Sequence, residues 1–308
     1  MKYLIIGTGG TGGAVGGFLA KAGYDVTFIA RGAHLAAMKE KGLSVKSGIQ
    51  GSFCVAAPKA CTAEEYCDIP DVVFVCVKGY SLDDAVTLLN RCANEKTVVI
   101  PILNIFGTGE TLQRRLPKLH VLDGCIYITS YVSALGEITQ GGKLFTVVFG
   151  ERNGQIGPEL EQIAKELEDS QIRVDLTDDI RRKCFQKYAL ISAMATVGAY
   201  YDATTGVVSS TPEMREMFIN LSKEIDALAN AMGIPFKEDI VAKNLQLMET
   251  AAPETTASMQ KDLKKGQNSE IDGLVFEPVR LGRRFNVQTP AFLMAAKKLG
   301  KGCFESHC

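Results

Sequence analysis

The sequence lacks the features that mark several large classes of protein. None of its apolar runs reaches the roughly 18 residues that cross a bilayer, and the N-terminal stretch MKYLIIGTGG is too short for a signal peptide. It has three His, and its nine Cys form no CxxC pair. We therefore expect neither a zinc site nor a disulfide framework, and the odd cysteine number suits a reducing cytoplasm. The net charge of -1 gives no reason to expect nucleic acid or a membrane as a partner.

The first half of the 308-residue chain, which is long enough for two domains, alternates strand and helix patterns. The expected strands are 3–6, 25–30, 72–77 and 97–103. Uninterrupted apolar runs such as VVFVCV are typical of strands buried on both faces of a parallel sheet, so a doubly wound sheet is predicted. Residues 121–150 have strand patterns without helices between them, and we expect them to add antiparallel strands to the edge of this sheet.

Strand patterns disappear from the second half of the chain. Six amphipathic segments follow instead, at residues 178–200, 211–231, 237–249, 258–266, 270–284 and 290–299. The sequence therefore predicts an α/β protein with a Rossmann-type, doubly wound N-terminal domain, residues 1–177, followed by an all-helical C-terminal domain, residues 178–308.

The stretch GTGGTG at residues 7–12 fits the dinucleotide-binding pattern G-x-G-x-x-G. We expect a strand before it, a helix after it and a second strand within about 30 residues, which is the context this pattern requires. Gly7 would permit the tight turn, Gly9 would let pyrophosphate approach the backbone, and Gly12 would allow close packing of helix on strand. The other members of the loop are Thr8, Gly10 and Thr11. The helix N-terminus would supply N–H groups and a partial positive charge to the pyrophosphate.

The end of the second expected strand selects the dinucleotide. An NAD enzyme usually has Asp or Glu there for the ribose 2′-hydroxyl, but residues 28–34 hold no carboxylate. Arg31 can pair with a 2′-phosphate, so NADP(H) is predicted; the alternative is an ordinary solvated arginine. Lys78 and Asn104 each end a buried run at the carboxyl edge of the sheet, where such sheets bind cofactor or substrate. For both, the alternative is a solvated strand terminus.

A single charge, Lys187, stands inside the apolar stretch CFQKYALISAMATVG. Together with the residues named above, and in the same order along the chain, Lys187 gives this sequence a resemblance to the 2-dehydropantoate 2-reductase (ketopantoate reductase) family. The resemblance rests on IIGTGGTGG, Arg31, Lys78 in VKGY, Asn104, Lys187, ASM at 257–259, EID at 270–272 and the closing RLGRRFNVQTP. It covers essentially the whole chain. It implies a Rossmann domain, then a helical domain, an active site in the cleft between them, NADPH as hydride donor and a 2-oxo acid as acceptor.

The resemblance also implies roles for individual residues. Lys187 resembles the catalytic lysine, and Glu270 the active-site glutamate near it. Ser258 resembles the serine that binds the substrate carboxylate, and Asn104 the asparagine that fixes cofactor and substrate. The chemistry agrees, because hydride transfer to a ketone leaves negative charge that an ammonium can stabilise and then protonate. From the residues alone, a snorkelling lysine, a helix N-cap serine and a first-turn acid are the more ordinary interpretations.

The chain departs from the family's pattern on the face of the Lys187 helix. Ile191 and Ala195, four and eight residues later, stand where the family usually carries asparagines near the substrate. An apolar pocket discriminates weakly, whereas a pocket built to bond a hydroxyl discriminates strongly. We therefore hypothesise a preference for a 2-oxo acid with an apolar branched tail, unless Ser192 or Thr205 supplies a polar contact.

Two further departures concern the backbone. Asn104 is followed by Ile105 where the family usually has Gly. Pro278 falls inside the helix that EID opens, and it is expected to kink or break that helix, because proline removes an N–H and clashes one turn back.

Three functions are compatible with these residues. The first is NADPH-dependent reduction of a 2-oxo acid, with conversion of 2-dehydropantoate to pantoate in pantothenate biosynthesis as the leading candidate. The second is reduction of an imine, as in opine-type dehydrogenases, although no amine site is identifiable. The third is a non-catalytic NADP-binding regulatory protein, which the presence of Lys187, Ser258 and Glu270 disfavours. A homodimer formed through the second domain is a further expectation.

Overall fold

The computed structural model describes residues 1–300, which divide into two compact units. The first unit comprises Met1–Leu103 and Gly107–Ile180. The second comprises Asn104–Phe106 and the helices from Arg181 onward. The three residues Asn104–Phe106 thus leave the strand-rich unit for the helical one, although the residues on both sides of them belong to the first. Two of the nine cysteines, Cys303 and Cys308, lie outside the described residues.

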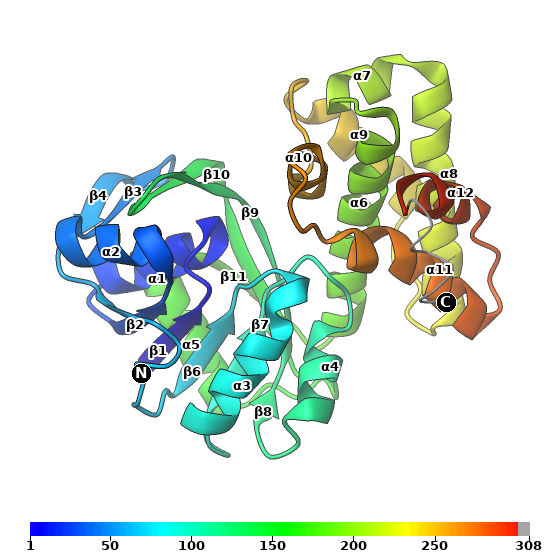
Figure 1. Cartoon of the computed structure of the whole chain (residues 1–308). Coiled ribbons are helices and arrows are strands. Elements are labelled where there is room, and N and C mark those ends of the chain that lie inside the picture. Colours follow the sequence, from blue (N-terminus) through cyan, green and yellow to red (C-terminus); the bar gives the residue numbers. More distant parts are fainter. Residues whose placement is uncertain (301–308) are drawn as a thin grey trace. The chain divides into compact units, whose positions relative to one another are not determined.

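A six-stranded parallel sheet forms the centre of the first unit (Figure 1). Its strands are β1 (Lys2–Ile6), β2 (Asp25–Ile29), β5 (Lys59–Cys61), β6 (Val72–Val75), β7 (Val98–Pro101) and β8 (His120–Val121). They lie in the order β5-β2-β1-β6-β7-β8, so the chain winds outward in both directions from β1. The helices of this unit are α1 (Gly10–Lys21), α2 (Gly32–Lys41), α3 (Leu82–Cys92), α4 (Thr108–Arg115) and α5 (Pro158–Asp169). The predicted Rossmann-type sheet is confirmed.

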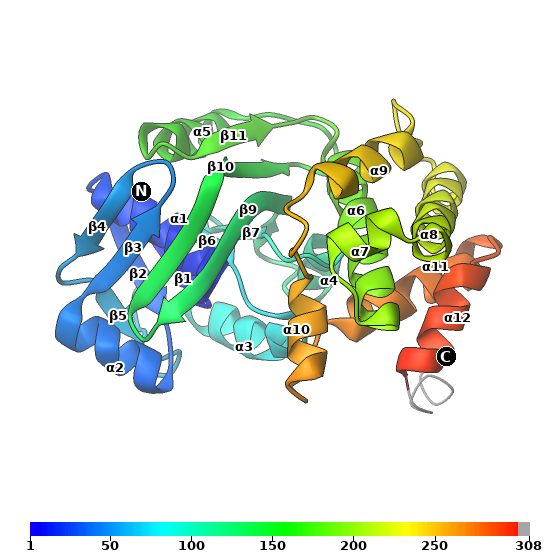
Figure 2. The same cartoon turned by 90° about the horizontal axis from the view of Figure 1, so that it is seen from above.

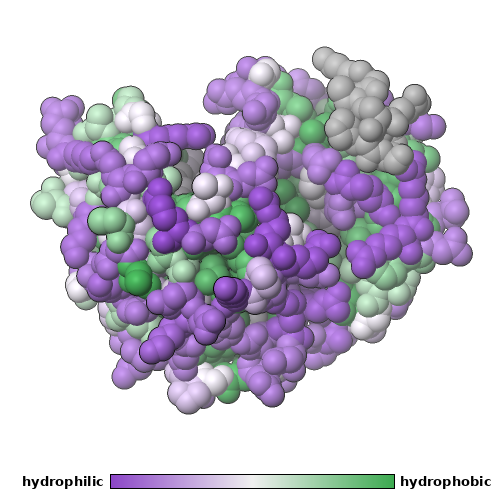
Figure 3. All heavy atoms as spheres, turned by 60° about the horizontal axis from the view of Figure 1, so that its bottom comes forward, coloured by the Kyte–Doolittle hydropathy of each residue, from purple (hydrophilic) through white to green (hydrophobic). Residues whose placement is uncertain are grey.

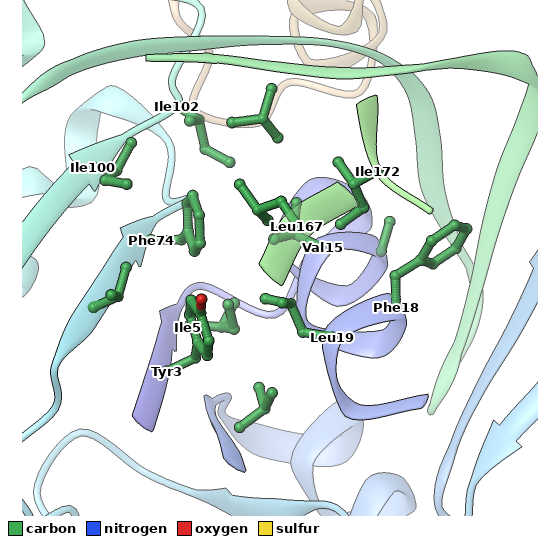
Figure 4. Close-up of a cluster of buried hydrophobic side chains, with 14 of the residues drawn as sticks. Tyr3, Ile5, Val15, Phe18, Leu19, Phe74, Ile100, Ile102, Leu167 and Ile172 are labelled. Atoms are coloured by element: carbon green, nitrogen blue, oxygen red, sulfur yellow. The ribbon is translucent and has the colours of Figure 1, made fainter. Parts of the chain in front are cut away.

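Alternate residues of β1 enter different cores, because side chains of a strand point to opposite faces. Tyr3 and Ile5 belong to a core with Phe18 of α1, which Figure 4 shows. Leu4 and Ile6 belong to a second core, which includes buried residues of α3 and α4. Helices therefore cover both faces of the sheet, and this is why β6 and β7 are buried along their whole length.

A second sheet corrects one expectation. Val121 ends β8 at the edge of the first sheet, but the rest of the segment forms the long strands β9 (Asp123–Ala134) and β10 (Glu137–Gly150), which pair antiparallel with each other and not with that edge. Instead β10 pairs in parallel with β3 (Leu43–Ser47) and β11 (Arg173–Leu176), and β3 pairs with β4 (Gly51–Val55), as Figure 2 shows. An alternating pattern predicts a strand but not its sheet, because β3, which places β10 in the second sheet, is distant from β10 in the sequence.

The second unit is helical throughout the part that the structure describes (Figure 1). Its long helices are α6 (Ile180–Tyr201) and α8 (Pro212–Ala231). The others are α7 (Thr205–Ser210), α9 (Ile240–Thr250), α10 (Ser258–Lys264), α11 (Glu277–Phe285) and α12 (Pro290–Leu299). Helix α8 packs against α7, α9, α11 and α12, which makes it the centre of this unit. The expected helical second half is confirmed.

The outer surface shows no broad apolar face on the side drawn in Figure 3, where hydrophobic residues are scattered among hydrophilic ones. Within residues 1–300, no helix combines the length and the apolarity needed to span a membrane. The same residues hold no group of three or more His, Cys, Asp or Glu side chains placed to bind a metal ion, and their cysteines are free thiols.

Candidate active site

The glycine-rich turn joins β1 to α1, as the motif requires. Gly7 has a φ of +97°, which favours glycine, and a Cβ on Gly12 would lie 2.2 Å from the carbonyl oxygen of Gly7. A Cβ on Gly10 would lie 2.6 Å from the carbonyl oxygen of Ser130. Gly9, the N-cap of α1, is different, because a Cβ there would meet nothing within 4 Å. The fold itself requires Gly7, Gly10 and Gly12, whereas the open space at Gly9 suits a pyrophosphate at the helix N-terminus.

Arg31 is exposed at the end of β2, where it is the N-cap residue of α2. The loop residue Thr8 lies against the same strand end, since both its N–H and its hydroxyl donate to the carbonyl oxygen of Ile29, at 3.2 and 2.9 Å. Thr11 is half-buried in the first turn of α1. Lys78 is half-buried three residues after β6, and it precedes a single 3-10 turn. The predicted cofactor residues Thr8, Thr11, Arg31 and Lys78 therefore all lie in the first unit, at or near the carboxyl ends of parallel strands.

His34 is a neighbour of this region that the sequence did not single out. Its Nδ1 accepts a hydrogen bond from the N–H of Gly136 at 3.1 Å, which ties α2 to the turn between β9 and β10. Burial lowers the pKa of His34 below its ordinary value. A neutral imidazole is needed for this contact, because a protonated Nδ1 has no lone pair to accept with. No local sequence signal predicts the contact, since it joins segments about a hundred residues apart.

Lys187 lies near the start of α6 and is 5% exposed. Its Nζ donates to Oδ1 of Asn104 at 2.6 Å. A lysine so deeply buried differs from the snorkelling alternative, in which the charged end stays in water. The structure thus brings two of the predicted site residues into direct contact within the helical unit.

The segment Asn104–Phe106 is anchored to α6 by its aromatic end. The ring of Phe106 lies 4.6 Å from that of Phe185, edge to face, and 6.1 Å from that of Tyr188. Such aromatic pairs stabilise by about 0.5–1.5 kcal/mol beyond the area they bury. This packing explains why these three residues join the helical unit, and it holds the Asn104 amide beside Lys187.

Ile105 has a partner that accounts for its departure from the family's glycine. A Cβ on Gly273 would lie 2.7 Å from Cγ1 of Ile105, so the Ile105 side chain occupies the space that a larger residue at 273 would need. The bulk at position 105 is therefore matched by a glycine at position 273.

Glu270 is 4% exposed and belongs to the same helical unit as Lys187. It lies two residues before a π-helical turn, Asp272–Phe276, which we call the π-turn, and α11 begins directly after that turn. The expected kink at Pro278 thus takes the form of a change in helix register. The N–H of Glu277 donates to the carbonyl oxygen of Asp272, five residues back instead of four.

Ser258 differs in its surroundings from Ile191 and Ala195, the two apolar residues on the Lys187 helix. Ser258 is exposed at the first position of α10, and Ala257 is the N-cap, so the N-cap interpretation of Ser258 does not apply. Ile191 is half-buried, whereas Ala195 is fully buried in the core of the helical unit. Thr205, one of the two residues considered as a polar contact for the substrate, donates from its hydroxyl to the carbonyl oxygen of Ala252 at 2.9 Å.

A Rossmann unit with an open helix N-terminus, followed by a helical unit that buries a lysine on an asparagine, is compatible with a nucleotide-dependent oxidoreductase. Residues 3–154 match the family model described as Ketopantoate reductase PanE/ApbA, and residues 179–301 match the model of its C-terminal domain. The chain belongs to the ketopantoate reductase family, whose members are NAD(P)-dependent oxidoreductases.

Relatives and solved structures agree with this assignment. The chain is 29% identical to the 2-dehydropantoate 2-reductase of Archaeoglobus fulgidus over 93% of its own length and 92% of the relative's. It is 28% identical to the uncharacterized oxidoreductase YkpB of Bacillus subtilis, over 94% and 95%. Among solved structures, the 2-dehydropantoate 2-reductase of Methylococcus capsulatus matches with a TM-score of 0.87 and 26% identity, over 100% and 98% of the two chains. A D-mandelate dehydrogenase solved with NADH and anilino(oxo)acetate has the same fold, with a TM-score of 0.87 at 21% identity, over 99% of each chain.

Proposed function

We propose that this protein reduces a 2-oxo acid to the corresponding 2-hydroxy acid, with a hydride from NADPH and a proton from Lys187. The observation that supports this most is the buried Lys187 side chain, whose Nζ lies 2.6 Å from Oδ1 of Asn104. An ammonium removed from water in this way interacts strongly with a developing negative charge, because little solvent screens it.

The residues of the first unit suit a phosphorylated dinucleotide. A pyrophosphate fits the open space at Gly9 on the N-terminus of α1, and the exposed Arg31 guanidinium is free of any carboxylate neighbour in sequence. The D-mandelate dehydrogenase of the same fold was solved with NADH, so the fold alone does not select the dinucleotide. Our choice of NADPH therefore depends on Arg31, and we propose that Lys78 and Asn104 contribute to binding it.

The proposed reaction needs three tasks from the protein. When bound, NADPH supplies the hydride that reaches the carbonyl carbon of the substrate. Lys187 would stabilise the negative charge on the carbonyl oxygen and then protonate it, while Asn104 orients its ammonium. Glu270 would favour the charged form of the lysine, and the hydroxyl of Ser258 would donate to the substrate carboxylate.

We propose 2-dehydropantoate, and thus a step of pantothenate biosynthesis, as the first substrate to test. The curated relative and the Methylococcus structure both carry the name 2-dehydropantoate 2-reductase, and this supports the choice.

An apolar-tailed 2-oxo acid is the second candidate, and a specific observation favours it. Ile191 is half-buried on the Lys187 helix, and the two nearby hydroxyl side chains, Ser192 and Thr205, already donate hydrogen bonds within the protein. Ser192 donates to the carbonyl oxygen of Leu274 at 2.6 Å, and Thr205 donates to the carbonyl oxygen of Ala252 at 2.9 Å. A substrate hydroxyl would therefore meet fewer available partners than in a pocket with asparagines.

Steady-state kinetics with NADPH separate the two candidates. We expect 2-oxoisovalerate to equal or exceed 2-dehydropantoate in kcat/KM if the tail pocket is apolar. We also expect Ile191→Asn to shift the ratio toward 2-dehydropantoate by about tenfold, the order of one added hydrogen bond. A kcat/KM for 2-dehydropantoate at least tenfold above that for 2-oxoisovalerate in the unaltered protein would exclude the second candidate.

We also propose a homodimer. The support is that a ketopantoate reductase of similar fold, from Staphylococcus aureus, is described as dimeric. Light scattering coupled to size-exclusion chromatography tests this directly, since a mass near 33.3 kDa would contradict it.

A further inference from the structure

Pro278 takes from two backbone carbonyls of the helical unit an N–H that a regular helix would offer them. A carbonyl in an α-helix accepts from the N–H four residues on, and in a π-helix from the N–H five residues on. Residue 278 is four residues after Leu274 and five after Gly273, and proline has no N–H to donate. Both Gly273 and Leu274 are buried, so water cannot readily satisfy their oxygens.

Two hydroxyls of α6 satisfy these two carbonyls. The hydroxyl of Tyr188 donates to the oxygen of Gly273 at 2.7 Å, and the hydroxyl of Ser192 donates to the oxygen of Leu274 at 2.6 Å. Tyr188 and Ser192 are four residues apart, so they lie on one face of α6. Their two acceptors, Gly273 and Leu274, are consecutive residues of the π-turn. Burial raises the pKa of Tyr188 well above its ordinary range, so its phenol stays a donor at working pH.

These hydrogen bonds connect two of the segments that carry the candidate catalytic groups, and a packing contact adds the third. Tyr188 directly follows Lys187 on α6, and the π-turn directly follows Glu270 and Ile271. Gly273 is also in contact range of Ile105, the residue after Asn104. The π-turn therefore accepts hydrogen bonds from two hydroxyls of α6, and its residue Gly273 packs against Ile105 of the Asn104 segment.

We propose that Tyr188 and Ser192 are positioning residues, which hold the π-turn created by Pro278 and so fix Glu270 and the Asn104 segment relative to Lys187. This inference rests on the proposed reductase function, in which Lys187, Asn104 and Glu270 act together. A π-turn inserts one residue into a helix, so its loss would rotate Glu270 by about 100° relative to α11, the angle of one residue in a helix of 3.6 residues per turn.

The test is a double-mutant cycle between Ser192→Ala and Pro278→Ala. In the unaltered background, Ser192→Ala removes the hydroxyl that donates to the Leu274 carbonyl, and we expect kcat to fall by about tenfold while the NADPH dissociation constant rises by less than about threefold. In the Pro278→Ala background residue 278 has an N–H for that carbonyl, so adding Ser192→Ala should change kcat by less than about twofold. The matched control is Ser222→Ala, which removes an equally buried hydroxyl from α8.

Tyr188→Phe gives an independent arm with its own control. We expect it to lower kcat, whereas Tyr201→Phe, which removes a phenol hydroxyl from the other end of the same helix, should leave kcat unchanged. Hydrogen exchange of the peptide 270–276 supplies a readout that does not depend on activity, and it should quicken in Ser192→Ala and Tyr188→Phe but not in the two controls.

The outcomes separate this proposal from the proposed function. If Ser192→Ala and Tyr188→Phe lower the melting temperature but leave kcat intact, the positioning role is wrong. Additive effects of Ser192→Ala and Pro278→Ala on kcat would likewise overturn it. If the unaltered protein turns over no 2-oxo acid, the reductase function fails, and unchanged exchange in the peptide 270–276 would then refute the π-turn contacts as well.

Discussion

The replacement of Lys187 by methionine isolates the chemical role of its ammonium group. Methionine keeps most of the apolar stem, which matters because the side chain is only 5% exposed. General acid catalysis contributes about 10²–10⁴-fold, and each tenfold loss corresponds to about 1.36 kcal/mol of transition-state stabilisation. The burial of Lys187 hinders a solvent molecule from taking its place, so we expect kcat to fall at least 100-fold, or by about 2.7 kcal/mol.

The same substitution should affect folding and cofactor binding little. It removes the hydrogen bond from Nζ to Oδ1 of Asn104, at a cost of about 1.5–3 kcal/mol, and this loss is offset because the cost of burying a charge is removed as well. Initial rates of NADPH oxidation at saturating 2-oxo acid give kcat, fluorescence titration gives the NADPH dissociation constant, and a thermal melt checks the fold. Lys223→Met on the exposed side of α8 is the matched control. Turnover within threefold of normal in Lys187→Met would refute the assignment of Lys187 as proton donor.

Three further predictions concern the first unit. Gly12→Ala should lower the melting temperature and abolish NADPH binding, because its Cβ would lie 2.2 Å from a carbonyl oxygen. Gly9→Ala should leave the melting temperature unchanged and weaken only NADPH binding, because a Cβ there meets no protein atom within 4 Å. Equal melting temperatures of the two variants would contradict this prediction. Arg31→Ala should raise the dissociation constant of NADPH by about 10–100-fold, the value of a charge-assisted hydrogen bond, with little change for NADH, and an equal loss for both in titrations would exclude a 2′-phosphate contact. Because burial lowers the pKa of His34, the unfolded chain takes up a proton at higher pH than the folded one, so stability should fall as pH drops through about 6.5. The melting temperature should therefore fall less between about pH 7.5 and 5.5 in His34→Gln than in the unaltered protein, and identical pH profiles would disprove this contribution.

The parts of the fold that were predictable are those that local pattern determines. The runs that became β6 and β7 are apolar without interruption, and only strands buried on both faces require this. The change from strand to helix patterns likewise marked the helical unit. By contrast, most of residues 121–150 were assigned to the wrong sheet, because β3, which places β10 in the second sheet, is distant from β10 in the sequence.

The candidate site shows the same limit at the level of single residues. The glycine pattern predicted the turn between β1 and α1, since the close contact of Gly12 with Gly7 is a local property. Proximity of Lys187 and Asn104 followed only from resemblance, because the aromatic packing of Phe106 that joins their segments leaves no periodic signal.

The π-turn lay partly within reach of the sequence. Pro278 predicted a disturbed helix, because its missing N–H is a local fact. The form of the disturbance was not predictable, since it depends on the hydroxyls of Tyr188 and Ser192, which come from another helix. Two hydroxyls four residues apart on a buried helix were the available signal.

The most direct test of the central claim is the consumption of NADPH by the purified protein in the presence of a panel of 2-oxo acids, with identification of the product. We predict oxidation of NADPH that depends on a 2-oxo acid, yields the matching 2-hydroxy acid in equal amount, and is lost in Lys187→Met. Tight binding of NADPH without turnover of any acid in the panel would contradict the account.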